Sequence, residues 1–153
     1  MKQLFLSSLV LIAGLIPTQA NAGHCTTAGT AGDWAYTYTG TILTSNGALP
    51  AASVGHFHMD ATGNLGGSQT RTVAGVPGAE DITGIMAVSQ NCTAVATIQV
   101  VVNGQLQRTA VLGLIFDRNQ NHSRGIFESL TLPNGTDVPV VLTIDAARLF
   151  SEH

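Results

Sequence analysis

The sequence predicts an all-β fold of eight antiparallel strands. Apolar, β-branched runs recur from Trp34 to Leu149, and Gly, Asn and Pro separate each run from the next. No window places its apolar residues at the spacing of an amphipathic helix. Short strands at regular intervals, with turn residues between them, are typical of an up-and-down meander that closes into a barrel or flattens into a sandwich.

The first 22 residues have the pattern of a secretory signal peptide. Lys2 supplies the positive charge, Leu4–Ile16 is an apolar run too short to span a bilayer, and Ala20–Ala22 fits the cleavage rule. We therefore expect an exported protein, periplasmic or extracellular, that begins at Gly23. A lipoprotein is the alternative, because Cys25 follows closely, but lipid attachment needs a small residue before the cysteine and a histidine stands there.

The composition limits the number of domains in the mature chain and the functions that it can have. Removing 22 of the 153 residues leaves 131, which suits a single domain spanning 23–153. The only lysine leaves with the signal, so five arginines face nine acids and the net charge is −4. The absence of a basic run argues against nucleic-acid binding, and the absence of lysine excludes Schiff-base chemistry.

Two cysteines, Cys25 and Cys92, are expected to form a disulfide. In an oxidising compartment a lone pair has one connectivity, and neither cysteine belongs to a CxxC motif or a basic stretch that would favour a reactive thiol. The bond would close a loop of nearly 70 residues, which the chain-entropy model values at about 4 kcal/mol of stability.

The eight strands follow from the apolar runs and the turns between them. We expect strands at Trp34–Leu43, Ala52–Met59, Leu65–Val73, Asp81–Val88, Ala94–Val102, Gln105–Phe116, Ser123–Leu132 and Val138–Leu149. Asn103-Gly104 is a two-residue hairpin signal of type I′. Asp60–Asn64 and Pro133–Gly135 have the composition of slightly longer turns.

The meander predicts which turns meet at each end of a barrel. Alternate turns lie at opposite ends, so the segment before the first strand, the turn after the fourth and the end of the eighth lie together. Cys25 precedes the first strand and Cys92 lies in the turn after the fourth. One missed or extra strand would separate the two cysteines by a barrel length, which is beyond the reach of a disulfide.

The ends of the first and last strands carry a resemblance to a known family. Gly32-Asp33-Trp34 opens the first strand, and Arg148 stands at the end of the last. These residues resemble the lipocalins and their calycin relatives, eight-stranded barrels with Gly-x-Trp at this point. The resemblance implies that Trp34 plugs the closed end beneath Arg148, a contact that cation–π attraction favours.

The chain also departs from the lipocalin pattern. It is short for a lipocalin, no helix follows the last strand, and no Thr-Asp-Tyr triplet precedes the seventh. Its overall pattern also resembles small exported bacterial β-barrel proteins. Without the resemblance, Trp34 would be interpreted as a core aromatic.

The opposite end of the barrel is the expected ligand entrance. Residues 44–50, 74–80, 103–104 and 133–136 would form its loops, of which 74–80 is the most flexible by composition. Strand alternation predicts five polar side chains that face inward and contact a ligand, namely Tyr36, Tyr38, Arg71, Arg108 and Glu128. An apolar cavity with these groups would suit a small apolar or amphipathic molecule. The alternatives are a lumen filled by side chains, and a register error of one residue that turns the set outward.

The sequence predicts no cofactor and no metal site. His56 and His58 have the spacing of two ligands on one strand face, but Phe57 and Met59 look like core, which turns the histidines toward solvent. No GxSxG, HExxH, P-loop or GxGxxG motif occurs. A structural or envelope-interaction protein is the first alternative function. A cofactor-free cyclase or isomerase, similar to allene oxide cyclase-like barrels, is the second.

Three strands are apolar on both faces, although a strand that faces water should alternate. The outward residues include Val101, Val111, Ile115 and Val141. A second copy of the chain is the simplest cover for them, and a homo-oligomer is therefore expected. A membrane barrel is the alternative, but seven aromatic residues are few for two aromatic girdles.

Overall fold

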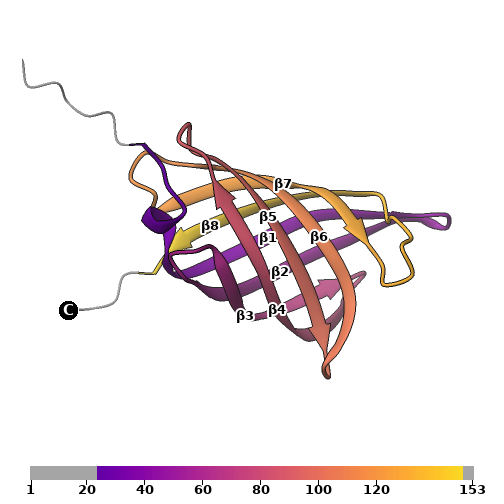
Figure 1. Cartoon of the computed structure of the whole chain (residues 1–153). Helices are drawn as coiled ribbons and strands as arrows, with labels where there is room; N and C mark the ends of the chain where they lie inside the picture. The colour runs from indigo at the N-terminus through magenta and orange to yellow at the C-terminus, as the bar shows by residue number, and fades with distance from the viewer. Residues whose placement is uncertain (1–23, 150–153) are drawn as a thin grey trace, which may run out of the picture.

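The computed structural model describes residues 24–149, which form a closed eight-stranded antiparallel β-barrel (Figure 1). A short 3-10 helix, η1 (Ala28–Thr30), precedes the strands. The strands are β1 (Gly32–Thr44), β2 (Gly47–Met59), β3 (Asn64–Val73), β4 (Val76–Val88), β5 (Thr93–Val102), β6 (Gln105–Phe116), β7 (His122–Thr131) and β8 (Val140–Arg148). Each strand pairs with the next, and β8 pairs with β1. The predicted fold class is confirmed, in its barrel form.

Two of the predicted entrance loops are tight turns instead. Thr44 pairs with Gly47 and Val73 pairs with Val76, so each hairpin turns through two residues. Ala74 and Gly75 have φ angles of 48° and 83°, the positive pair that a type I′ turn requires. The predictions of loops at 44–50 and 74–80 are therefore wrong, because the strands continue almost to the hairpin tips. Residues 47–50 belong to β2 and 76–80 belong to β4.

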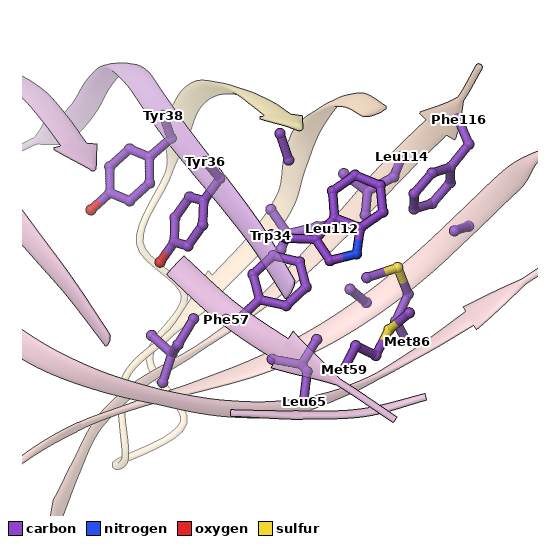
Figure 2. Packing of buried hydrophobic residues seen from close by; sticks show 14 of the residues in the cluster. Trp34, Tyr36, Tyr38, Phe57, Met59, Leu65, Met86, Leu112, Leu114 and Phe116 are labelled. Carbon is purple, nitrogen blue, oxygen red and sulfur yellow. The ribbon is translucent and has the colours of Figure 1, made fainter. Parts of the chain in front are cut away.

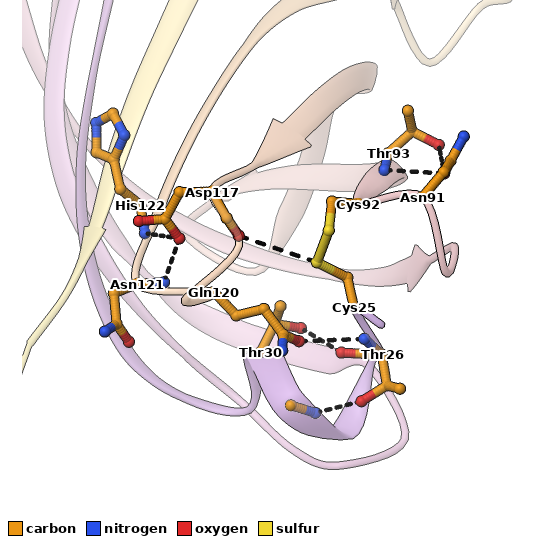
Figure 3. The surroundings of a disulfide bond; sticks show 11 residues. Cys25, Thr26, Thr30, Asn91, Cys92, Thr93, Asp117, Gln120, Asn121 and His122 are labelled. Atoms are coloured by element: carbon orange, nitrogen blue, oxygen red, sulfur yellow. Dashed lines mark hydrogen bonds between the residues drawn. A yellow bond between two sulfur atoms is a disulfide. The ribbon is translucent and has the colours of Figure 1, made fainter. Parts of the chain in front are cut away.

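The predicted disulfide is present at the end of the barrel where the described chain begins (Figure 3). The Cα atoms of Cys25 and Cys92 are 4.9 Å apart. Gln120, in the β6–β7 loop, accepts a hydrogen bond from the backbone nitrogen of Thr26 at 3.1 Å. The disulfide ties the segment before β1 to the β4–β5 turn, and the Thr26–Gln120 hydrogen bond ties it to the β6–β7 loop. The meander predicts that these turns lie at one end of the barrel. The predicted signal peptide lies outside the described residues.

The core lies inside the barrel, on the inward face of each strand. In β4, for example, Glu80, Ile82 and Met86 are buried, whereas Asp81 and Thr83 between them are exposed. His56 and His58 are exposed, as predicted, and His58 Nδ1 lies 2.8 Å from a carboxylate oxygen of Asp33.

Two of the four apolar residues that the sequence places on the outer face are largely exposed. Ile115 and Val141 are 64% and 67% exposed, whereas Val101 and Val111 are only partly exposed. Within residues 24–149 there is no helix with the length and hydropathy to cross a membrane.

β7 is irregular, and the irregularity changes which of its residues face inward. A bulge shifts its register against β6, so that Val111 pairs with Ser129 and Leu112 with Phe127. Glu128 is the extra residue between these pairs. β7 pairs with β8 only over His122–Ile126. Beyond that point β7 continues to pair with β6, and β8 continues to pair with β1.

Candidate functional site

The barrel encloses a cavity of about 310 Å³ to which all eight strands contribute. Its lining is predominantly apolar and includes Ile98, Val100, Leu112, Leu142 and Ile144. Small inward residues leave this space open: Ala96, Ala110 and Ala146 are all at most 4% exposed and line the cavity. A larger side chain at these positions would fill the lumen.

Trp34 forms the floor of the cavity at the closed end (Figure 2). Its ring stacks on Phe57 with centroids 6.2 Å apart and meets Phe116 edge-on at 5.6 Å. Trp34 Nε1 donates a hydrogen bond to the Thr30 carbonyl at 2.9 Å, so its one polar group is satisfied although the side chain is buried. The closed end is therefore a layer of packed aromatic rings.

Arg148 covers the indole of Trp34. The guanidinium carbon lies 5.4 Å from the ring centroid, within cation–π range, and Nη2 donates to the Gly29 carbonyl at 2.5 Å. Arg148 Nε is buried and has no hydrogen-bond partner within the described part of the chain. The two residues meet because β1 and β8 pair with Trp34 opposite Arg148.

A polar cluster lies in the wall of the cavity, built around the buried carboxylate of Glu80. Arg71 Nε donates to Oε1 at 2.5 Å and Arg108 Nη1 donates to the same oxygen at 2.8 Å. Arg108 Nη2 and Gln69 Nε2 donate to Oε2, the latter at 2.6 Å. The two guanidiniums and the amide come from β3 and β6, on either side of β4 and β5.

The cluster continues through Gln69 to the first two strands. Tyr36 donates its hydroxyl proton to Gln69 Oε1 at 2.8 Å, and Ser53 donates to the same oxygen at 3.1 Å. This chain of bonds fixes the Gln69 amide, because its nitrogen must face Glu80 and its oxygen must face the two hydroxyls. The side chains are thus held in one arrangement.

The ionisation states in the cluster follow from burial and from the ion pairs. Burial alone would raise the pKa of Glu80, but hydrogen bonds and charges from Arg108 and Arg71 outweigh it and hold that pKa below its usual value. Burial raises the pKa of Tyr36 far above its ordinary value, and it also raises the pKa of Tyr38. At neutral pH Glu80 is ionised and both tyrosines are protonated.

Four of the five predicted ligand-binding residues line the cavity, and the fifth does not. Tyr36, Tyr38, Arg71 and Arg108 all contribute to the lining. Glu128 instead lies on the outer face, exposed, so its predicted place inside the barrel is wrong.

The β7 bulge explains the outward position of Glu128. Phe127 occupies the inward position and packs edge-on against Tyr38, with ring centroids 5.3 Å apart. Glu128 lies over Gly113 on the outside: a Cβ on that glycine would be 2.3 Å from Glu128 Oε1.

Sequence reasoning missed Glu80, the acid that organises the cluster. The sequence places Glu80 at the end of the predicted 74–80 loop, whereas it is an inward residue of β4. The signal was available in Ala74-Gly75, a two-residue turn that extends β4 back to Val76. With that turn, Glu80 has the same parity as the inward residues Ile82 and Met86.

Comparisons with known proteins support the fold. No family model and no curated protein matches the chain. One similar solved structure is EF1p2_mFAP2b bound to DFHBI, with a TM-score of 0.54, 15% identity, and coverage of 81% of this chain and 97% of that chain. Another is a redesigned β-barrel, mFAP1, bound to DFHBI, with a TM-score of 0.50, 19% identity, and coverage of 80% and 98%. At these identities the likeness shows the barrel fold alone.

Proposed function

We propose that this protein is an exported binding module that holds a small apolar or amphipathic molecule inside its barrel. The single observation that carries the proposal is the cavity of about 310 Å³, whose apolar lining is interrupted by one polar cluster. Ligand pockets commonly have this form, with volumes of about 300–1,000 Å³ and a few polar groups that fix orientation.

Two further observations support the proposal. The two solved structures described above are both bound to a small molecule, DFHBI. The contact of Trp34 with Arg148 at the closed end also agrees with the lipocalin resemblance of Gly32, Trp34 and Arg148. These likenesses favour a ligand in the lumen and leave its identity open.

The two alternative functions fit the site less well. A structural or envelope-interaction barrel needs a filled lumen, whereas small alanines leave this one open. A cyclase or isomerase that works by proton transfer needs a group that accepts a proton, but Glu80 has a lowered pKa and accepts four hydrogen bonds, and Tyr36 stays protonated. The cluster is equipped to bind and orient a molecule.

Export and self-association are part of the proposal. The Cys25–Cys92 disulfide supports an oxidising compartment, the periplasm or the exterior. Exposed Ile115 and Val141 on the outer face support a homo-oligomer, which stays a prediction that sedimentation analysis can test.

The proposal is tested with phenylnaphthylamine, a neutral probe whose fluorescence rises in apolar surroundings. We expect saturable binding by the oxidised protein. Ala110→Phe places a ring in the cavity and should weaken binding by about tenfold or more, equivalent to about 1.4 kcal/mol. Val111→Phe is the matched control, because the next residue of β6 faces outward. Absence of saturable binding, or an equal loss in both variants, would refute the proposal.

A further inference from the structure

The charges in the cavity wall do not balance. Glu80 contributes one negative charge, and its side chain is 1% exposed. Arg71 and Arg108 contribute two positive charges, and their side chains are 30% and 16% exposed. These arginines are the only charged residues that line the cavity among residues 24–149. The three side chains therefore carry a net charge of +1 at the wall of a predominantly apolar space.

The acceptor capacity of the cluster is already used. The two Glu80 oxygens accept four hydrogen bonds, which is the number of lone-pair sites of a carboxylate. Gln69 Oε1 accepts two more, from Tyr36 and Ser53. A ligand that arrives with hydrogen-bond donors finds only neutral hydroxyl oxygens there, such as those of Tyr36 and Tyr38, and a positive charge finds no free carboxylate.

Donor capacity remains on Arg71. Its Nε is committed to Glu80, while neither of its two terminal nitrogens has a hydrogen-bond partner within the described part of the chain. The residue paired with Arg71 on β4 is Gly78, so the paired position has no side chain to cover the terminal nitrogens of the guanidinium. A Cβ at Gly78 would lie 3.8 Å from Arg71 Cζ and Nη2.

We propose that the ligand's head group is an anion, a carboxylate or similar oxyanion, and that Arg71 is its principal contact. Arg108 is the fixed partner of Glu80 and holds the wall in place, while Arg71 turns its terminal nitrogens to the ligand. A planar oxyanion matches two adjacent N–H donors of a guanidinium. The apolar body of the ligand then extends over Ala110 and Leu112 toward Trp34. This inference rests on the proposed function and adds the charge of the ligand to it.

The test compares two probes that share one ring system. Anilinonaphthalene sulfonate carries an anionic group that phenylnaphthylamine lacks. We expect the oxidised protein to bind the sulfonate about tenfold more tightly than the neutral probe, the factor that one charge-assisted hydrogen bond supplies. Arg71→Gln should remove this preference, so that the two probes bind within about twofold of each other. Arg71→Lys, which keeps the charge, should restore part of it.

Controls separate the charge of the cavity from other effects. Arg124→Gln removes an arginine from the outer face, where Arg124 is 77% exposed, and should leave both affinities unchanged. Ala110→Phe should weaken both probes if they occupy the lumen. Circular dichroism of each variant shows that the barrel is folded.

The outcomes distinguish this inference from the proposed function. If the neutral probe binds and the sulfonate has no Arg71-dependent advantage, the anionic head group is refuted and the binding module stands. If neither probe binds in the lumen, the proposed function is refuted, and this inference falls with it.

Discussion

The sharpest prediction about stability concerns the buried carboxylate of Glu80. Glu80→Gln keeps the shape of the side chain and removes its charge. One amide oxygen still accepts from the arginines, but the new amide nitrogen faces other donors, so about half of the hydrogen bonds to this residue are lost. Arg71 and Arg108 are left without a counter-ion.

The size of the effect follows from the burial of the partners. Removing one member of a buried ion pair costs about 3–5 kcal/mol. Arg71 is 30% and Arg108 16% exposed, so water rehydrates them in part and the lower end applies, about 3 kcal/mol. For a domain of this size the melting temperature should fall by about 10 °C. Glu128→Gln is the matched control, an exposed acid whose loss should change stability by less than about 0.5 kcal/mol.

Urea unfolding of the oxidised protein measures both variants, and pH gives a second readout. The folded-state pKa of Glu80 is below its unfolded value, so its stabilisation is present above the unfolded pKa and is lost as pH falls through the folded pKa. The difference between wild type and Glu80→Gln should therefore shrink in acid. A loss below about 1 kcal/mol at neutral pH, or one equal to that of Glu128→Gln, would contradict the reasoning.

Three further predictions concern the frame of the barrel. Replacing Cys25 and Cys92 together by serine should lower the free energy of unfolding by about 4 kcal/mol, because the bond spans 67 residues; a loss under about 1 kcal/mol in urea unfolding would show that the segment before β1 is held by other contacts. Gly40→Ala should cost about 3 kcal/mol in the same assay, because Gly40 has a φ of 149° and a Cβ would lie 2.0 Å from a carbonyl oxygen of β8; an unchanged midpoint would contradict this. Hydrogen bonds from Thr62 and its neighbours lower the pKa of Asp60 to about 2, so carbon NMR should find this carboxyl ionised at pH 3, and a midpoint near 4 would be the opposing result.

Much of the fold was predictable because the barrel obeys two local rules throughout most of its length. Inward and outward residues alternate along each strand, and turn residues mark where strands end. Cys25 and Cys92 added a long-range check, since only an intact strand count brings them together. β6 (Gln105–Phe116) was predicted with the bounds that the structure has.

The site was predictable only where those rules hold. Tyr36, Tyr38 and Arg71 lie on regular stretches of strand, and Arg108 is the last regularly paired residue before a register shift between β5 and β6, so parity places all four inside. Glu128 is the extra residue of a bulge, and one extra residue reverses the facing of the positions on its two sides. No composition signal in Ile126–Ser129 marks that bulge.

Glu80 was missed for a different reason. Pro77 and Gly78 suggested a long flexible loop, yet both residues continue β4 beyond a two-residue turn. The sequence therefore offers Glu128 as the acid beside the two inward arginines, whereas the structure pairs both of them with Glu80. The position of one turn, Ala74-Gly75, therefore decides whether Glu80 is counted among the inward residues.

The central claim is that the lumen holds a ligand, and a crystal structure of the oxidised protein with phenylnaphthylamine tests it most directly. The account predicts electron density for the probe inside the barrel, between Trp34 at the floor and Arg108 in the wall, with the strands unmoved. A lumen filled by side chains, with the probe absent or bound outside, would contradict it.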